Sequence, residues 1–419
     1  MLSILLVVPL VACSQPVAAD IVKSNKPRIT SPDVSTGDKA ALVEGNSAFA
    51  FDLYQSLRTK DGNLFYSPQS ISMALAMTYA GARGETEQQM ADTLHFTLSQ
   101  AQLHPAFNNL DIELAKRGQG AKGKDGKGFR LNTVNAIWGQ KDYKFLPAYL
   151  DVLAENYGAG LRILDFVNNT EKSRITINDW VSNQTESRIK DLIPQGAINE
   201  LTRLVLTNAR YLNAAWQHPF NTAATTDGQF HLLDGKQVTV PMMKQAESLG
   251  YAKGEGYQSV ELSYDGREIS MVILLPEAGK FETFEKGLTS QQVAAITKSL
   301  QSARVTLTMP RFEFDSDFSL KSTLTGMGMP VAFTDKADFS GMTGNRELMI
   351  SDVIHKAFVS VDEAGTEAAA ATAVIVGETS MPIDPPIQVT IDRPFIFLIR
   401  DIGTGTILFI GRVVNPGTK

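Results

Sequence analysis

The stretch VDEAGTEAAAATAVIVGETSMP, residues 361–382, decides how this chain is interpreted. Between its acidic groups lies a run of small and aliphatic residues, Ala364 to Ile375, that is too short and too interrupted to span a membrane. Its four successive alanines favour helix, whereas the valine-rich run that follows them favours strand. The pattern therefore predicts a segment with two competing conformations.

The composition is typical of a globular protein. Of the 419 residues, 43% are hydrophobic and 20% are charged. The net charge is −6 with both signs interspersed, which argues against a nucleic-acid surface and against a polybasic membrane patch. Helical patterns dominate early and strand patterns late, and we find neither an internal repeat nor a domain linker. We therefore expect one large α+β domain rather than alternating βαβ units.

Several segments predict individual elements. Ser67 and Pro68 are typical of a helix start, because Ser caps the first turn and Pro is tolerated in it. Residues 177–193 predict an amphipathic helix that ends at Pro194. Two apolar runs within residues 394–414, separated by the turn sequence DIGTG, predict a buried β-hairpin.

The N-terminus indicates export. Residues 2–12, LSILLVVPLVA, form a short apolar run typical of a signal-peptide core, although no basic residue precedes it. The sequence LVAC at residues 10–13, where this run ends, resembles a bacterial lipoprotein cleavage box, which predicts a signal peptide over 1–13 and a lipid on Cys13. Residues 14–40 then predict a flexible tether before a domain over 41–419. The expected location is a lipid-anchored cell surface or periplasm, with plain secretion as the alternative, and the lipid is the only expected membrane contact.

No catalytic or metal-binding motif is present. The five histidines are scattered and Cys13 is the single cysteine, so neither a zinc site nor an internal disulfide is expected. The chain has no G-x-S-x-G elbow and no Walker loop, so we expect no enzyme activity and no cofactor. The basic loop over 118–128, GQGAKGKDGKG, leaves two interpretations open, a solvated turn and a polyanion site.

Residues 361–382 resemble the hinge of the reactive-centre loop in the serpin family. Three other segments resemble this family in the same order: NLFYSPQSISMALAM (63–77), LTNARYLNAAWQHPF (206–220) and DRPFIFLIRDIGTGTILFIGRVVNP (392–416). The resemblance spans about residues 41–416. It implies a monomeric single domain with three β-sheets, about nine helices and an exposed reactive-centre loop over about residues 363–386.

The resemblance also implies an activity, the covalent trapping of serine proteases and, in some members, of cysteine proteases. The protease cuts the loop and forms an acyl-enzyme, and the cut loop inserts into the main sheet before the ester is hydrolysed. Every second residue from Thr366 to Val376 is uncharged and either small or β-branched, which suits a strand that becomes buried. The implied hinge residues are Glu363, Gly365, Thr366, Glu367, Ala368, Ala370 and Thr372. The alternative is a non-inhibitory member that acts as a binding or chaperone-like protein.

The scissile bond follows from the same resemblance. If Glu363 counts as the first hinge residue, the seventeenth is Thr379, and the bond is Thr379–Ser380, with Glu378 and Ser380 as neighbouring alternatives. A count back from the segment DRPF places the bond about four residues later, near Ile383. Residues 364–392 contain no Lys or Arg, which disfavours trypsin-like proteases. We expect an elastase- or subtilisin-like target, with a Glu-specific protease as the alternative.

The resemblance finally implies two control regions. The shutter is a polar cluster that holds the main sheet closed, and its members are Ser67, Ser70, Asn208 and His355. The breach lies where the loop inserts, and its members are Trp216 above the insertion point and an ion pair between Arg311 and Glu363. If that ion pair is exposed, it contributes little to stability.

Overall fold

The computed structural model describes residues 19–123, 127–366 and 385–418. The helices within these residues are α1 (Thr36–Leu57), α2 (Pro68–Tyr79), α3 (Gly84–Leu94), α4 (Gln100–Ala115), α5 (Pro147–Tyr157), α6 (Thr170–Gln184), η1 (Thr222–Ala224), α7 (Phe281–Lys286), α8 (Ser290–Ser299), α9 (Lys321–Met327), η2 (Val331–Phe333) and α10 (Ser340–Thr343). The strands are β1 (Asp20–Val22), β2 (Leu64–Tyr66), β3 (Arg130–Gln140), β4 (Leu161–Leu164), β5 (Leu204–Ala215), β6 (Thr226–His231), β7 (Gln237–Gly254), β8 (Tyr257–Ser263), β9 (Ile269–Pro276), β10 (Gln301–Pro310), β11 (Phe312–Ser319), β12 (Asp352–Val361), β13 (Gly365–Thr366), β14 (Ile387–Thr390), β15 (Phe395–Asp401) and β16 (Ile407–Val413).

The strands form two hydrogen-bonded sheets. The first has seven strands in the order β1-β4-β3-β5-β13-β12-β11, and the second has nine, β14-β10-β7-β8-β9-β15-β16-β2 with β6 beside β7. Strand β7 pairs with β6 near its start, with β10 along its middle and with β8 near its end. Division of the second sheet at β7 gives the three sheets that the resemblance implies. The α+β expectation is confirmed, with ten α-helices in the described residues.

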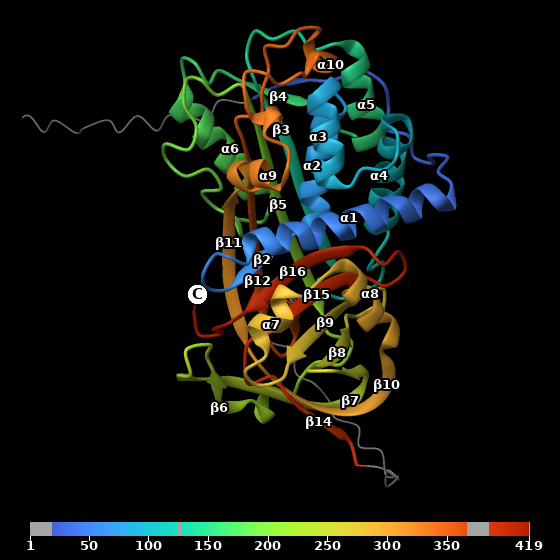
Figure 1. The fold of residues 1–419 in the computed structure, drawn as a ribbon, viewed down its shortest axis with the longest axis vertical. Helices are drawn as coiled ribbons and strands as arrows, with labels where there is room; N and C mark the ends of the chain where they lie inside the picture. The colour runs from blue at the N-terminus through green and yellow to red at the C-terminus, as the bar shows by residue number, and fades with distance from the viewer. Residues whose placement is uncertain (1–18, 124–126, 367–384, 419) are drawn as a thin grey trace, which may run out of the picture.

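The sheets and helices form layers. In Figure 1, α2 to α5 lie to one side of the seven-stranded sheet, α6 lies to the other side, and α1 crosses the middle of the molecule. The nine-stranded sheet fills the lower half of that view together with α7 and α8. Most buried apolar side chains belong to one continuous core, and a smaller separate cluster lies beneath α6. The seven-stranded sheet is therefore covered on both faces.

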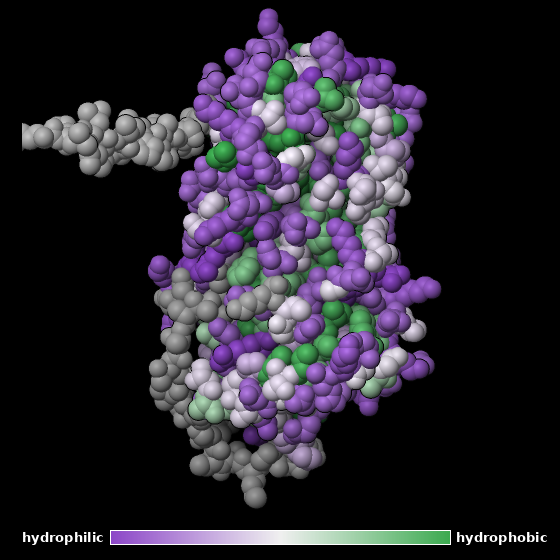
Figure 2. All heavy atoms as spheres, turned by 90° about the vertical axis from the view of Figure 1, so that its left-hand side faces the viewer, coloured by the Kyte–Doolittle hydropathy of each residue, from purple (hydrophilic) through white to green (hydrophobic). Residues whose placement is uncertain are grey.

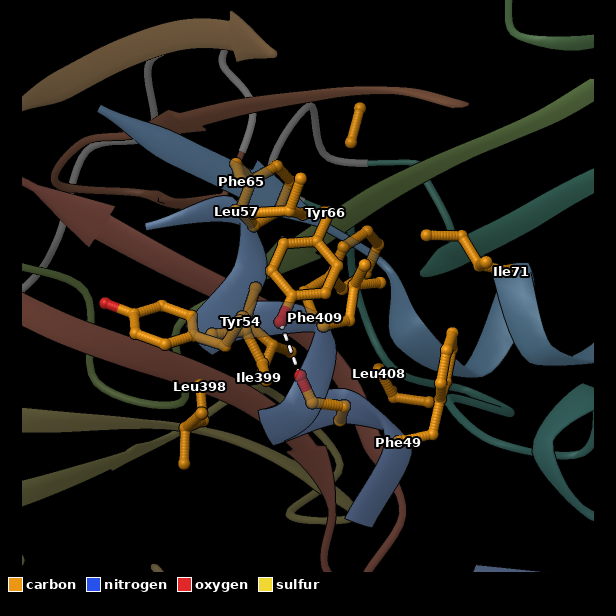
Figure 3. Packing of buried hydrophobic residues seen from close by; sticks show 14 of the residues in the cluster. Phe49, Tyr54, Leu57, Phe65, Tyr66, Ile71, Leu398, Ile399, Leu408 and Phe409 are labelled. Carbon is orange, nitrogen blue, oxygen red and sulfur yellow. Dashed lines mark hydrogen bonds between the residues drawn. The ribbon is translucent and has the colours of Figure 1, made fainter. Parts of the chain in front are cut away.

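The centre of the core ties α1 to the nine-stranded sheet (Figure 3). Phe65 of β2 stacks on Phe409 of β16 with ring centroids 4.9 Å apart. The hydroxyl of Tyr66 donates a hydrogen bond of 2.7 Å to the carbonyl oxygen of Ala50 in α1. Because this buried contact is satisfied, the hydrogen bond offsets the cost of burying both polar groups and helps to fix the position of α1.

Local signals predicted some element boundaries correctly and one of them wrongly. Ser67 caps α2 by accepting a hydrogen bond from the backbone nitrogen of Ser70, and the hairpin of β15 and β16 is present. The helix predicted up to Pro194 is wrong at its end, because α6 stops at Gln184. The backbone of the next residues, 186–187, has positive φ, which ends the helical path.

The predicted tether over 14–40 also needs correction, because from residue 20 onward the chain packs on the domain. Strand β1 pairs with β4 at the edge of the seven-stranded sheet. Lys26 forms ion pairs of 3.0 Å with both Asp151 and Glu155 on α5, and Arg28 reaches Asp111 on α4 at 2.6 Å. Helix α1 then begins at residue 36, inside the predicted tether. Residues 1–18, among them Cys13, lie outside the described residues.

One face of the molecule is predominantly hydrophilic. Figure 2 shows the face on the side of β11 and α6, where hydrophilic side chains dominate and apolar ones form separate patches. Within the described ranges, no helix combines the length and apolar character needed to cross a membrane. The same ranges contain no cluster of three or more His, Cys, Asp or Glu side chains that could hold a metal ion.

Candidate functional site

The short strand β13 lies between β5 and β12 at one end of the seven-stranded sheet. Gly365 pairs with Ala215 on β5. Thr366 pairs with Ala214 on β5 and with Val361 on β12. Both pairings are antiparallel. Gly365 and Thr366, near the start of the stretch 361–382, are therefore already part of the seven-stranded sheet.

Beyond β13, strands β5 and β12 pair directly with each other in parallel. Six residue pairs join them, from Asp352–Val205 to Ala357–Arg210. We call the last pair, Ala357–Arg210, the fork, because the two strands follow separate pairings beyond it. Three residues of β5, Tyr211–Asn213, separate the fork from β13. The fork therefore lies directly ahead of any strand that lengthens from β13.

Gly365 is required by its surroundings. Its φ of 153° falls in a region that residues with side chains rarely adopt. An added Cβ atom would also collide with the backbone oxygen of Ala214 and would lie 2.7 Å from the Cα of Ala215. Only glycine lets the chain approach β5 this closely.

The carboxylate of Glu363 is buried at the breach. The residue is only 4% exposed, and its Oε1 accepts a 2.8 Å hydrogen bond from Nε of Arg311. A second guanidinium nitrogen of Arg311 and the hydroxyl of Thr225 donate to the same oxygen. Burial alone raises the pKa of Glu363, but these hydrogen bonds outweigh burial and hold the pKa below its usual value. The carboxylate is thus buried, so the condition under which this ion pair would contribute little is met only on the side of Arg311, whose side chain is 42% exposed.

Trp216 covers the start of β13. Its indole nitrogen donates to the carbonyl oxygen of Asp362 at 2.9 Å, and its backbone nitrogen donates to that of Ala364 at 2.9 Å. The indole stacks on Tyr264 with a centroid distance of 4.6 Å. The hydroxyl of Tyr264 shares a 2.7 Å hydrogen bond with the hydroxyl of Thr366. The side chain of Thr366 therefore points into the core beneath the sheet.

The shutter residues form one hydrogen-bonded cluster. The backbone nitrogen of Ser67 donates to Nε2 of His355 at 3.2 Å, so Nε2 carries no proton. Nδ1 of His355 must then carry the proton, and it donates to Oδ1 of Asn208. Burial, assisted by the positive charge of Arg210, lowers the pKa of His355 to about 3. The ring is therefore neutral at physiological pH.

The cluster contains a member that the sequence did not reveal, Asn135 on β3. Asn135 lies directly opposite Asn208 in the pairing of β3 with β5. The amide nitrogen of Asn208 donates to Oγ of Ser70 at 2.5 Å and to Oδ1 of Asn135. The hydroxyl of Ser70 also donates to Oδ1 of Asn135 at 3.1 Å. Only the strand register identifies Asn135, so the sequence carried no signal for it.

Arg210 and Gln69 extend the cluster toward the fork. Nη1 of Arg210 donates to Oγ of Ser67 at 3.3 Å and to the side-chain oxygen of Gln69. Arg210 follows Asn208 by two residues, so both side chains lie on one face of β5. This spacing was a signal in the sequence that the prediction did not use. The shutter thus includes a buried cation.

Part of the predicted site lies outside the described residues. These positions are Cys13, Glu367, Ala368, Ala370, Thr372, Glu378, Thr379, Ser380 and Ile383. Their roles as hinge, scissile bond and lipid site stay predictions. The predicted residues inside the described ranges fall into two groups, the breach around β13 and the shutter beside the fork, both on the line between β5 and β12.

Comparisons with known proteins agree with this architecture. The model of the serpin family, described as serine protease inhibitor, matches residues 44–416. The chain is 40% identical over 381 residues to an uncharacterized serpin-like protein of Thermococcus kodakarensis, covering 91% of this chain and 87% of the relative. It is also 40% identical over 387 residues to leukocyte elastase inhibitor A of Mus musculus, covering 90% and 99%.

A solved structure shows the same fold. The complex of human thyroxine-binding globulin with thyroxine superposes with a TM-score of 0.80 at 31% identity, and the match covers 91% of this chain and 100% of the other. The family model and the curated relatives each span most of the sequence, and the fold agrees with them. This chain therefore belongs to the serpin family.

Proposed function

We propose that this protein inhibits serine proteases by a covalent trap in which the cut loop becomes a central strand of the seven-stranded sheet. The observation that carries the proposal is the position of β13 between β5 and β12 in the seven-stranded sheet. Gly365 and Thr366 already pair with β5, and Thr366 also pairs with β12, both antiparallel. A strand that lengthens from this start needs no change of register to pass between β5 and β12.

The register assigns each inserting residue to a position. If the inserted strand continued the register of the pair Thr366–Ala214, Ala370 would lie opposite Arg210 and Thr372 opposite Asn208. On the β12 side, Thr372 would lie opposite His355. Because residues opposite each other point to the same face, the even-numbered residues would face the core, as Thr366 does. Thr372 would then replace the direct contact of His355 with Asn208 by contacts of its own hydroxyl.

The chemistry belongs to the protease. Its serine oxygen attacks the carbonyl carbon of Thr379, the Thr379–Ser380 bond breaks, and the new amino group of Ser380 leaves with a proton. The thirteen residues from Glu367 to Thr379 would then insert before water can hydrolyse the ester. A net gain of about 0.5–1.5 kcal/mol per backbone hydrogen bond gives on the order of 10 kcal/mol. A protease is stable by only about 5–15 kcal/mol, so this gain suffices to distort it.

The proposed targets are elastase- or subtilisin-like proteases. The absence of Lys and Arg over 364–392 removes the cation that a trypsin-like pocket requires. The mouse relative named leukocyte elastase inhibitor A supports the same direction. We propose further that the chain is exported and that Cys13 carries a lipid, on the strength of the apolar run over 2–12.

The test is incubation of the protein with an elastase-like, a subtilisin-like and a trypsin-like protease. We expect the elastase-like or the subtilisin-like protease to form an adduct that survives a denaturing gel. We also expect a released C-terminal fragment whose mass corresponds to a chain that starts at Ser380. The trypsin-like protease serves as the control and should form no adduct. Cleavage of the loop by both the elastase-like and the subtilisin-like protease without any adduct would refute the trap.

A second candidate function is favoured by one cavity. A space of about 680 Å³ lies between α1, α4, α8 and the turn that joins β15 to β16. This volume is within the range of small-molecule sites, and Leu42, Leu110 and Val293 are among the apolar side chains that line it. The similar structure of thyroxine-binding globulin holds thyroxine. The alternative function is thus the binding of a small apolar ligand without inhibition.

This alternative has its own test. Titration with an apolar fluorescent probe should show saturable binding that Val293→Trp abolishes by filling the cavity. Leu131→Trp, at a partly buried position outside this cavity, is the matched control. Absence of saturable binding in the unmodified protein would reject the ligand-binding function.

A further inference from the structure

Arg210 places a positive charge inside the protein, and no carboxylate of the described residues forms a hydrogen bond or ion pair with it. The residue is 1% exposed, and Nη1 donates only to the neutral side chains of Ser67 and Gln69. Its guanidinium carbon lies 5.5 Å from the ring centroid of Phe409. Nε is buried and has no hydrogen-bond acceptor in the part of the chain that the structure describes. Because an uncompensated charge is costly in the interior, buried arginines normally meet an anion.

A cavity of about 420 Å³ lies against this guanidinium. It is bounded by α4, by β3 and by the end of α6, and Arg210 is part of its wall. Thr133, the cross-strand neighbour of Arg210 on β3, also lines it, as does Gln184. The space is large enough for a small ion together with water. The unpartnered cation therefore borders a space that can hold a ligand.

The charges around the cavity favour a monovalent anion. Asp111 lines the cavity, but its carboxylate is bound to Arg28 at 2.6 Å. Burial lowers the pKa of Arg210 to about 10, while Asp111 acts in the opposite direction, so the guanidinium stays protonated near neutral pH. Arg28 and Arg210 are two cations against the single anion Asp111, which leaves one net positive charge. A divalent anion would also meet stronger repulsion from Asp111.

Neighbouring groups lack acceptors in the same way. The buried amide nitrogens of Gln69 and Asn135 have no hydrogen-bond partner among the described residues. Gln69 is bound to Arg210 through its oxygen, and Asn135 lies two residues from Thr133 on the same face of β3. With Nε of Arg210, all three unpartnered atoms are donors. The cluster behind the cavity wall is therefore rich in donors and in positive charge, which attracts an anion into the cavity.

We propose that this cavity binds a small monovalent anion such as chloride, held by the guanidinium of Arg210 and the hydroxyl of Thr133, both residues of its wall. Arg210 belongs to the last residue pair before β5 and β12 diverge. A bound anion therefore stabilises the closed fork and slows its opening. The binding site stands independently of protease inhibition, and only its effect on loop insertion rests on the proposed function.

The first experiment measures chloride binding to the full chain from the line width of the chloride NMR signal. We expect excess width in the unmodified protein, its loss in Arg210→Met and a reduction in Thr133→Val. Arg304→Met, which removes an exposed cation from β10, is the matched control and should keep the excess width. Acetate should compete with chloride more strongly than sulfate does.

Two outcomes would overturn the site. One is unchanged excess width in Arg210→Met, and the other is equal displacement by sulfate, because either means adventitious ion binding at the surface. If Arg210→Met does not fold, Thr133→Val decides, since it keeps the cation and removes only a hydroxyl that lines the cavity. Unchanged width in that folded variant would also reject the site.

The second experiment tests the effect on the fork by hydrogen–deuterium exchange. Chloride at twice its dissociation constant should slow exchange in peptides of β5 and β12 about threefold relative to sulfate of equal ionic strength. The slowing should persist in Arg304→Met and vanish in Arg210→Met. Equal slowing in both variants would reject the effect. Failure of the protease trap would appear separately, as a missing covalent adduct.

Discussion

Gly365 is the residue at the hinge whose replacement the structure tolerates least. In Gly365→Ala the added Cβ would collide with the carbonyl of Ala214, and φ would remain in an unfavourable region. We expect β13 to detach and the free energy of unfolding to fall by about 1–3 kcal/mol, measured by urea denaturation. Gly326→Ala in α9, where the added atom meets open space, is the control and should be neutral or stabilising. Equal stability of Gly365→Ala and the unmodified protein would contradict the close pairing of Gly365 with β5.

His355 makes stability depend on pH. Burial lowers the pKa of His355 to about 3 and that of His104 to about 4, from an ordinary value of 6.5. Below pH 6.5 the unfolded chain binds protons that the native protein does not, so stability is complete above this pH and falls as the pH decreases. Each histidine contributes a slope of up to about 1.4 kcal/mol per pH unit.

Urea denaturation at about pH 7 and about pH 5 measures this loss. In His355→Gln the loss should shrink by about 2 kcal/mol, because one of the two protons is no longer taken up. His231→Gln, at an exposed position, should retain the full loss. A slope that stays the same in His355→Gln would show that this ring does not titrate on unfolding.

At the scale of elements, the two faces of the proposed inserting strand tolerate different side chains. The face toward the core excludes charge, whereas the alternate face accepts it. In the proposed insertion, a strand that continued the register of β13 would bring Ala370 beside the buried Arg210, so Ala370→Arg would carry a second guanidinium into the core. We expect this variant to be cut as a substrate without forming the adduct, and the ratio of adduct to cleaved protein on a denaturing gel measures the change. Glu367→Arg, on the alternate face, is the control and should still trap the protease. Equal trapping by both variants would mean that the loop does not insert in this register.

Elements differ in how far their own sequence predicts them. The start of α2 and the hairpin of β15 and β16 follow from a capping Ser67 and from a turn sequence, which are local signals. Strand β1 was missed because its three residues are held by β4 and by the contacts of Lys26 and Arg28, all made with distant parts of the chain. The end of α6 was placed too late because positive φ at 186–187 has no strong sequence signal.

The same distinction holds for the candidate site. The family resemblance placed Ser67, Asn208 and His355 in one cluster, and the structure brings them together. The partner on β3, Asn135, could not be found, because cross-strand neighbours depend on register rather than on sequence spacing. The burial of Glu363 was also missed, since a charged residue in a loop segment normally faces solvent.

For the whole molecule, the proposed trap requires that the intact fold is not the most stable arrangement of the chain. Cleavage in the loop should raise the melting temperature, because the new strand adds on the order of 10 kcal/mol of hydrogen bonding. With an unfolding entropy of about 2.1 cal/mol/K per residue, this corresponds to about 10 °C. Calorimetry of intact and cleaved protein measures the shift. An unchanged melting temperature after complete cleavage would exclude stored free energy in the intact form.

The six pairs that join β5 to β12 set the order in which a growing strand meets resistance. The first three added residues would lie opposite Tyr211–Asn213, before any of these pairs. From the pair Ala357–Arg210 onward, each rung that opens gives up one strand neighbour and gains two. Insertion would thus have one main barrier, the opening of the pair Ala357–Arg210. Beyond that pair, each inserted residue would gain more strand pairing than it disrupts, so further insertion would be favoured over withdrawal of the strand.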